Sequence, residues 1–363
     1  MKKWLFGLSI CMLIGLTGCG EQNVAQAQEQ KYGMNLDLAR RPYTIDVLKK
    51  YIDDVKKSGG NYVHLHLTDD ENYALESRLL GQPAKKSWQQ KDGLYRNPLT
   101  KQTFLSMKQM RSLEAYAAKK KIELIPEIDT PSHMGAILKL YEKANPKAAK
   151  KLVRDEWNQI APNQSSIRFV QALYREVLQA LPKTKTMHIG GDEIAYDEED
   201  HVKYIYYFNQ MNRYLQKKHV RTWIWNDSLL KADLKKLDQT IAITFWSWTG
   251  EPESTTEKKY REKVCPSAPQ LIKAGYTVYN YNDYYLYVDF TSKGSIRSNL
   301  QYMKRDIKKN WTLGRWNSSH QQTTSKISGA AISIWGEGSK KYTADQVYNY
   351  TKELFPTMMK KVK

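Results

Sequence analysis

Cysteine, long apolar segments and acidic residues are all scarce in this sequence. Its 363 residues contain three cysteines, and beyond the amino-terminal segment no apolar run approaches the ~20 residues that cross a bilayer. A disulfide-stabilised scaffold and a polytopic membrane protein are therefore excluded. The mean hydropathy is −0.68, yet 41% of the residues are hydrophobic, and 10 Trp and 25 Tyr are present. This composition excludes a disordered chain and predicts a globular protein with one large core or at most two domains.

The shortage of acids leaves a strongly basic chain. Lys and Arg number 57 against 38 Asp and Glu, which gives a net charge of +19. Such a charge favours anionic surfaces such as phospholipid head groups or anionic cell-surface polymers. Nucleic acid is the other partner that basicity raises, but no recognition motif accompanies it, and we expect no nucleic-acid binding.

The amino-terminal residues are typical of an export signal. Lys2 and Lys3 precede an apolar stretch, Trp4 to Leu16, that is short for a membrane span. The next residues complete the sequence LTGC, ending at Cys19, which is typical of a bacterial lipobox, although an ordinary secretory signal with a chance cysteine would look similar. We expect a signal peptide at 1–18, lipidation of Cys19, a tether at 19–30 and a protein anchored to the membrane at the bacterial cell surface. Cys265 would then be the one unmodified thiol, and no intrachain disulfide could form.

From residue 31 onward, short apolar runs alternate with amphipathic helices, and no long linker divides the chain. Eight strands are predicted, at 33–38, 62–67, 122–125, 186–189, 222–225, 241–245, 277–281 and 330–334. Helices are predicted at 44–57, 106–120, 166–181, 204–218 and 343–354, the last one ended by Pro356. This alternation predicts an α/β fold, a single (β/α)8 TIM barrel covering residues 31–363. A doubly wound open sheet is the alternative, but no Gly-rich phosphate-binding turn follows the first strand.

Polar and aromatic residues gather where the strands are predicted to end, and in such a barrel the active site is built at the carboxyl ends of the strands. The strongest signal is Asp192-Glu193, which follows the fourth strand and the flexible pair Gly190-Gly191. Two crowded carboxyl groups separate their proton affinities, so that one can act as an acid while the other stays ionised, as in glycosidases. Because neighbours in sequence cannot easily straddle a sugar ring, the spacing favours a mechanism whose nucleophile belongs to the substrate.

Aromatic and histidine residues at other strands allow two interpretations each. Trp225, Trp246 and Trp335 end three strands and predict a wall that stacks against a pyranose, although they could simply fill the top of the barrel. His64 and His66 point the same way from one strand and could bind a metal, but later strands supply few further ligands. We therefore expect no metal and no cofactor, and hydrogen-bonded structural imidazoles beneath the site.

With these residues assembled, the sequence resembles glycoside hydrolase family 20, the β-N-acetylhexosaminidases, and within it the dispersin B-like subgroup. The matching segments keep family order over nearly the whole chain: MNLDLAR at 34–40, GGNYVHLHLTDDENYALES at 59–77, ELIPEIDTPSHM at 123–134, HIGGDE at 188–193, WND at 225–227, YNDYYLY at 281–287 and ISIWGE at 332–337.

The resemblance implies retaining, substrate-assisted hydrolysis, in which the acetamido oxygen of the bound sugar attacks its own C1. Glu193 would be the general acid and base, and Asp192 would hold the acetamido N–H. Tyr285 would hydrogen-bond the acetamido oxygen, and Trp225, Trp246 and Trp335 would surround its methyl group. The remaining implied roles are sugar contacts by Arg40, Asp227 and Glu337, and orientation of Glu193 by Asp69 and His133.

Because this sequence departs from the family pattern at several positions, it does not determine which sugars are preferred beyond the first one. Ser132 and Arg41 replace residues that are usually Gly and His, and the segment 247–251 alters the lip that meets the leaving group. The subgroup implies poly-β-1,6-N-acetylglucosamine, a biofilm polysaccharide that is cationic when partly deacetylated. A basic exterior repels that polymer unless an acidic rim dominates locally, for which Glu251, Glu253 and the run 197–200 are candidates. The alternatives are a β-1,4 chitooligosaccharide or wall-fragment hexosaminidase and a catalytically dead sugar-binding lipoprotein.

Overall fold

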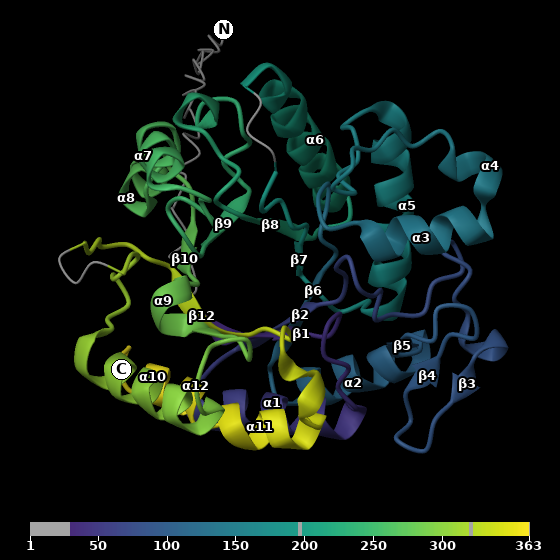
Figure 1. Ribbon diagram of the computed structural model, residues 1–363, viewed down its shortest axis with the longest axis horizontal. Helices are drawn as coiled ribbons and strands as arrows, with labels where there is room; N and C mark the ends of the chain where they lie inside the picture. Colours follow the sequence, from purple (N-terminus) through teal and green to yellow (C-terminus); the bar gives the residue numbers. More distant parts are fainter. Residues whose placement is uncertain (1–29, 195–197, 319–321, 363) are drawn as a thin grey trace, which may run out of the picture.

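The computed structural model describes residues 30–194, 198–318 and 322–362, which form a closed ring of parallel strands inside a ring of helices (Figure 1). The predicted signal peptide, Cys19 and nearly all of the tether lie outside the described residues. The barrel runs in the order β1-β2-β6-β7-β8-β9-β10-β12, and β12 pairs back onto β1 to close it. Its strands are β1 Lys31–Asp37, β2 Tyr62–His66, β6 Glu123–Glu127, β7 Thr186–His188, β8 Arg221–Trp225, β9 Ala242–Phe245, β10 Val278–Asn280 and β12 Gly329–Ile334.

The predicted (β/α)8 barrel is therefore confirmed, and the alternative of an open doubly wound sheet is wrong. Each of the eight predicted strands is present with ends within two residues of those expected. All seven residues of β1 are buried, because one face meets the barrel interior and the other meets helices. Strands of this kind appear in the sequence as continuous apolar runs, which is why they were visible without an alternating pattern.

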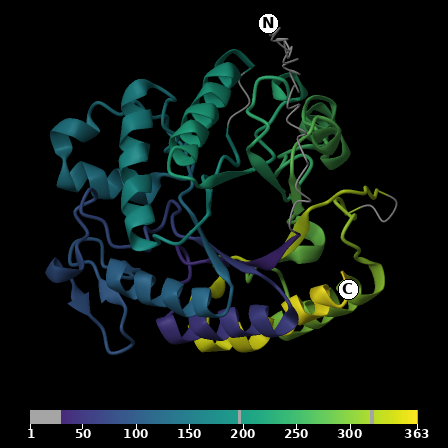
Figure 2. The ribbon, with the colours of Figure 1, turned by 180° about the vertical axis from the view of Figure 1, so that it is seen from behind.

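Helices cover the outer face of the strand ring (Figure 2). The helices that pack around the barrel are α1 Ile45–Ser58, α2 Met107–Lys119, α5 Gln164–Ala180, α6 Glu198–Gln216, α8 Ala268–Lys273, α10 Ile296–Asn310, α11 Ala344–Thr351 and α12 Leu354–Met359. The bounds of α1 follow from its caps, since the Thr44 hydroxyl accepts the Val47 N–H and Gly59 adopts a left-handed conformation with φ 90°.

Two predicted helices are wrong in their extent. The helix expected at 204–218 begins six residues earlier, because α6 spans Glu198–Gln216. A single helix was expected to reach residue 354 and stop at Pro356, but the chain forms α11 and then α12, and Pro356 lies inside the first turn of α12. Proline is tolerated there because the first N–H groups of a helix have no intrahelical acceptor.

Longer connections at the carboxyl ends of the strands carry additional elements. They are the sheet β3 Trp88–Gln89, β4 Tyr95–Arg96 and β5 Thr103–Phe104, the helices α3 Gly135–Ala144, α4 Pro146–Ala149, α7 Thr255–Val264 and α9 Asp283–Leu286, the strand β11 Tyr287–Val288, and the short turns η1 Ala84–Lys86, η2 Lys231–Asp233 and η3 Ser339–Lys341. β11 extends the sheet by pairing with β12. None of the helices within the described residues is long and apolar enough to cross a membrane.

Candidate active site

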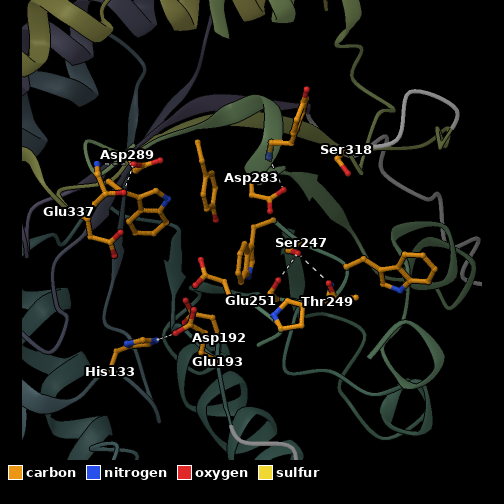
Figure 3. A pocket seen from close by; sticks show the side chains of 18 of the residues that line it. His133, Asp192, Glu193, Ser247, Thr249, Glu251, Asp283, Asp289, Ser318 and Glu337 are labelled. Atoms are coloured by element: carbon orange, nitrogen blue, oxygen red, sulfur yellow. Dashed lines mark hydrogen bonds and ion pairs between the residues drawn. The ribbon is translucent and has the colours of Figure 1, made fainter. Parts of the chain in front are cut away.

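A cavity of about 1040 Å³ opens at the carboxyl ends of the barrel strands (Figure 3). Its lining is strongly acidic: carboxylates come from Asp69, Asp70, Glu71, Asp192, Glu193, Glu251, Glu262, Asp283, Asp289 and Glu337, whereas its Lys and Arg residues are Arg40 and Lys258. The expected acidic rim is thus present at Glu251, and it includes residues that the sequence did not single out, above all Asp283 and Asp289. Glu253 does not line the cavity, and the side chains of 197–200 lie outside the described residues.

The turn after β7 brings the two predicted catalytic carboxylates into this cavity. Gly190 and Gly191 have φ values of 79° and 95°, which disfavour any residue with a Cβ. At Gly190 a Cβ would also lie 1.8 Å from Oδ1 of Asp129, so the turn can pass β6 only with glycine there. Glu193 itself has φ 51°, and its N–H donates to Oδ2 of Asp227 at 3.0 Å. A strained backbone held by hydrogen bonds is common where a side chain must be aimed accurately.

Glu193 is paired with an imidazole. Nε2 of His133 lies 3.2 Å from Oε2 of Glu193, while Nδ1 lies 3.6 Å from Asp70 and 3.8 Å from Asp69. The hydrogen bond from His133 lowers the pKa of Glu193. Burial opposes a charge on His133, but its hydrogen bonds to Asp70 and Glu193 raise its pKa well above the ordinary value. In the free protein the shared proton therefore resides on the imidazole.

The environment of Asp192 raises its pKa, whereas that of Glu193 lowers it. Its side chain is half-buried, and the buried Oδ1 has no hydrogen-bond partner among the described residues. Burial, together with the negative charge of Glu193, raises the pKa of Asp192. Burial and the charge of Asp192 likewise raise the pKa of Asp129 well above its usual value. An unsatisfied buried acceptor at the cavity wall is suited to receive a donor from a ligand.

Arg40 lies among four carboxylates at the other side of the cavity. Its guanidinium lies 2.6 Å from Asp69, 3.1 Å from Asp37 and 3.4 Å from both Glu71 and Glu337. These charges outweigh burial and raise the pKa of Arg40, so it stays a cation. Its fork is held rigidly, as bidentate recognition of neighbouring hydroxyls requires.

Aromatic rings form the apolar part of the lining. Tyr287 stacks on Trp246 with ring centroids 6.0 Å apart and an interplanar angle of 7°, and it meets the edge of Trp335 at 5.4 Å. Trp246 and Trp335 line the cavity as predicted, but Trp225 does not. The indole of Trp225 is buried below them, and its Nε1–H donates to Glu127 at 2.7 Å. Trp225 therefore supports the wall from beneath instead of forming it.

The tyrosine predicted to meet the acetamido group is at the wrong position. The hydroxyl of Tyr285 hydrogen-bonds Arg315, and Tyr285 lines a separate hollow against α10 instead of the cavity. Tyr287, two residues later, lines the cavity. Burial and the charge of Asp283 raise the pKa of Tyr287 well above its usual value, so its hydroxyl remains a proton donor.

Asp227 is likewise not a sugar contact. It is fully buried, and its two oxygens accept the N–H of Glu193 at 3.0 Å and the Nε1–H of Trp246 at 2.9 Å. Burial and the charge of Asp192 raise the pKa of Asp227 to about 7. Asp227 positions two residues of the cavity, and it does not line the cavity itself.

Glu127 organises the barrel interior beneath the site. Its carboxylate lies 2.6 Å from His66, 3.1 Å from His64 and 3.0 Å from His188, in addition to the bond from Trp225. Burial opposes the charge of Glu127, but the histidines hold its pKa well below the usual range. His66 also bridges to Asp69 at 3.0 Å. The expectation that these imidazoles are hydrogen-bonded is confirmed, and His64 lies beneath the cavity as expected, whereas His66 also lines the cavity.

The same groups could in principle surround a metal, since His64, Glu127 and His188 offer ligand atoms within 4.8 Å of one another. Burial lowers the pKa of His64 to about 4, so it is neutral. Nδ1 of His188 faces Glu127 and accepts the Gly190 N–H, and its Nε2 lies 2.8 Å from the Thr244 hydroxyl. The ring nitrogens of His188 are therefore used within the protein, which does not fit a metal ligand.

Comparison with known proteins adds to this geometry. The profile described as "Glycosyl hydrolase family 20, catalytic domain" matches residues 32–356. The crystal structure of dispersin B superimposes with a TM-score of 0.88 at 39% sequence identity, covering 92% of this chain and 99% of that one. The β-N-acetylhexosaminidase of Bacteroides fragilis shares the fold, with a TM-score of 0.65, 21% identity, and coverage of 92% of this chain and 65% of that one.

Relatives with curated names are longer proteins. The beta-hexosaminidase of Vibrio furnissii is 29% identical over 184 residues, which cover 47% of this chain and 30% of the relative. That of Porphyromonas gingivalis is 26% identical over 243 residues, which cover 60% of this chain and 30% of the relative. The matched part of this chain thus spans about a third of the length of these relatives.

Proposed function

This chain belongs to glycosyl hydrolase family 20, and on that premise we propose that it hydrolyses β-linked N-acetylglucosamine with the acetamido group of the substrate as the nucleophile. The observation that carries the proposal is one acidic cavity that Asp192, Glu193 and Tyr287 line together with the indoles of Trp246 and Trp335. No protein nucleophile is needed, because the two carboxylates come from one turn and do not face each other across a sugar ring.

In the first step the acetamido carbonyl oxygen bonds to C1 as the glycosidic C1–O bond breaks, and Glu193 gives its proton to the departing oxygen. The product is a cyclic oxazolinium ion. In the second step water attacks C1, Glu193 takes its proton, and the ring opens to the sugar with retained β configuration. Proton transfer from His133 to Glu193 supplies the acid that the first step needs, since the two groups lie 3.2 Å apart.

Asp192 and Tyr287 act on the acetamido group itself. The unpartnered Oδ1 of Asp192 accepts the acetamido N–H and stabilises the positive charge that develops there. The Tyr287 hydroxyl donates to the acetamido oxygen, and Trp246 and Trp335 enclose the methyl group. Arg40 and Glu337, on the opposite wall, bind the ring hydroxyls.

We further propose that the physiological substrate is poly-β-1,6-N-acetylglucosamine, and that the protein acts as a biofilm-dispersing enzyme. The dispersin-like sequence segments and the 39% identity to dispersin B support this substrate. The surplus of carboxylates over cations in the cavity also supports it, because a partly deacetylated polymer carries ammonium groups that such a lining attracts. Hydrolysis of β-1,4 chitooligosaccharides is the second candidate, since the same residues would serve either linkage.

The test is a comparison of linkages. Purified protein should release the chromophore from a β-N-acetylglucosaminide, and it should cleave β-1,6-linked oligomers of N-acetylglucosamine with kcat/KM at least about tenfold above that for β-1,4 oligomers of equal length. A reversed preference would assign the protein to chitooligosaccharides or wall fragments. Binding of the oligomers without any release of chromophore would leave only a sugar-binding lipoprotein.

We also propose that the protein is exported and anchored through lipid on Cys19. The basic start, the apolar stretch and the LTGC segment support this location. Expression in bacteria fed an alkyne-labelled fatty acid should label the wild-type chain and leave Cys19→Ser unlabelled. Equal labelling of both, or of neither, would contradict the anchor.

A further inference from the structure

Basic residues are concentrated at the end of the barrel opposite the cavity. Helices of the barrel end there and return to the next strand, so we define this basal face by the returns at 55–61, 116–122, 177–185, 213–220, 234–241, 270–277 and 326–328. Each return contains at least one lysine: Lys56 and Lys57, Lys119 to Lys121, Lys183 and Lys185, Lys217 and Lys218, Lys235 and Lys236, Lys273, and Lys326.

Acids are nearly missing from the same returns. The one carboxylate in them is Asp238, which accepts the N–H of Thr240 at 3.0 Å and its hydroxyl at 2.7 Å. Glu123, at the start of β6, pairs with Lys31 and accepts the N–H of Lys185 at 3.0 Å. Glu123 is thus partnered by Lys31, and Lys120 pairs with Asp53 at 3.0 Å, so the unbalanced charge of this face comes from its remaining lysines.

Helix stability alone does not explain this pattern. Lysines near the carboxyl end of a helix stabilise its dipole, which accounts for Lys56 and Lys57 in α1. Lys183, Lys185 and Lys326, however, lie outside any helix. Lys183, Lys185 and Lys217 are exposed and form no ion pair among the described residues. Exposed like charges on one face repel each other, so binding of an anionic partner would lower the electrostatic free energy of this face.

A hollow of about 270 Å³ lies within this face. Its lining includes Lys121, Lys183 and Lys185, and two carboxylates, Glu114 and Glu123. Glu114 accepts the N–H of Lys183 at 2.8 Å, so its charge is also directed inward. The ammonium groups around the hollow suit a phosphate group, which a lysine binds as a point charge.

The chain enters the barrel at the same face, because β1 begins at Lys31. The residues from Cys19 to residue 30 can reach at most roughly 40 Å, so lipid on Cys19 would keep this face near the bilayer. At physiological ionic strength surface charges are felt over about 8 Å, so a body on such a tether samples the distance at which lysines meet anionic head groups.

We propose that the basal face docks on the anionic head groups of a phospholipid bilayer and turns the catalytic cavity away from the membrane. This orientation opens the acidic cavity toward an external cationic polymer. The inference takes its setting from the proposed anchoring, but its test does not depend on lipidation or on catalysis.

The test uses residues 20–363, because the closed barrel and its covering helices lie within residues 30–362. This protein should sediment with vesicles that contain phosphatidylglycerol and not with vesicles of phosphatidylcholine alone, and high salt should release it. The variant K183E/K185E/K217E/K218E should bind the anionic vesicles at least about tenfold more weakly. Its matched control is K143E/K147E/K150E/K151E, which changes the net charge equally at exposed lysines on or beside α3 and α4.

The two variants separate the outcomes. If the control loses as much binding as the basal variant, net charge and not this face attracts the vesicles, and the proposal fails. It also fails if wild-type protein ignores anionic vesicles, or if duplex DNA or a wall polymer binds the basal face while vesicles do not. Hydrolysis of the chromogenic substrate should be unchanged in both variants, so a failed docking test leaves the proposed activity intact.

Discussion

His133 and Glu193 share one proton in the free site, and we expect this pair to set the pH range of activity. The imidazole has a pKa well above its ordinary value, and it lowers the pKa of Glu193. The pair therefore keeps a transferable proton to a higher pH than an isolated carboxyl group could.

Replacement of this imidazole should shift the alkaline side of the pH profile. In His133→Gln the proton must be held by Glu193 alone. The imidazolium that lowers the pKa of Glu193 is then gone, but a carboxyl group still loses its proton near its ordinary pKa, well below that of the pair. The alkaline limb of kcat/KM should therefore move to lower pH, by about the difference between the ordinary pKa values of an imidazole and a carboxyl group. The profile is measured with the chromogenic substrate between pH 4 and pH 9. An unchanged alkaline limb would show that His133 does not hold the proton that Glu193 donates.

Glu193 should be needed for turnover and not for binding. Glu193→Gln keeps the shape of the side chain but cannot donate a proton, so kcat should fall by about 10²–10⁴-fold. Affinity for N-acetylglucosamine, measured by calorimetry, should stay within about threefold, because Arg40, Asp192 and the indoles are unchanged. Near-normal turnover in this variant would refute the assignment.

Two neighbouring tyrosines offer a matched comparison. Tyr287→Phe removes a hydroxyl in the cavity and should lower kcat by about 10²-fold, a loss typical of one donor to a developing charge. Tyr285→Phe removes a hydroxyl that faces Arg315 and should leave kcat nearly unchanged. The reverse order of effects would restore Tyr285 as the acetamido partner.

At this scale the sequence revealed which acids and imidazoles meet, because strand ends converge at one edge of a barrel. Asp192, Glu193, His133, Arg40 and Glu337 all line the cavity, as expected. The choice between Tyr285 and Tyr287 could not be made, because α9 is a single helical turn followed by β11, and this change of period decides which ring faces inward. Asp227 was misassigned because its partners are the backbone N–H of Glu193 and the indole N–H of Trp246, and no sequence motif displays either contact.

At the scale of one element, the turn after β7 depends on two glycines for different reasons. Both have positive φ, but a Cβ at Gly190 would collide with Asp129 and its backbone, whereas one at Gly191 would come close only to the end of the Phe208 side chain, at 2.9 Å. The turn can therefore carry Asp192 and Glu193 only while the strands β6 and β7 stay in close contact.

A pair of alanine variants separates strain from collision. Gly275→Ala introduces a Cβ at φ 96° with no neighbour nearer than 3.5 Å, and it should cost about 1 kcal/mol of stability. Gly190→Ala adds a collision to similar strain, so its cost in urea unfolding should be clearly larger, about 3 kcal/mol, with loss of activity. Equal unfolding midpoints for the two variants would contradict the packing argument.

Most of the helices and strands could be predicted from the sequence. Buried strands gave apolar runs, and caps such as Thr44 and Gly59 fixed the ends of α1. The final helix was misjudged because proline was treated as a stop, although it is compatible with a first turn. The small sheet β3-β4-β5 has two-residue strands, too short for any periodic signal.

At the scale of the whole molecule, charge is sorted between the two ends of the barrel. The total of +19 was known from the sequence, but its separation into an acidic cavity and a basic basal face emerges only from the topology, in which helix ends alternate with strand ends. If the substrate is the proposed cationic polymer, the same topology would let a basic protein attract it at the active site.

The central claim is that the acetamido oxygen of the substrate attacks C1, and stepwise fluorination of the N-acetyl methyl group of a chromogenic substrate tests it most directly. Fluorine withdraws electrons from the carbonyl oxygen and leaves the rest of the sugar unchanged. If that oxygen is the nucleophile, kcat should fall steeply and progressively from acetyl to trifluoroacetyl, by several orders of magnitude in total. A kcat that stays level across the series would mean that a group of the protein attacks the sugar, and the account given for Asp192, Glu193 and Tyr287 would be wrong.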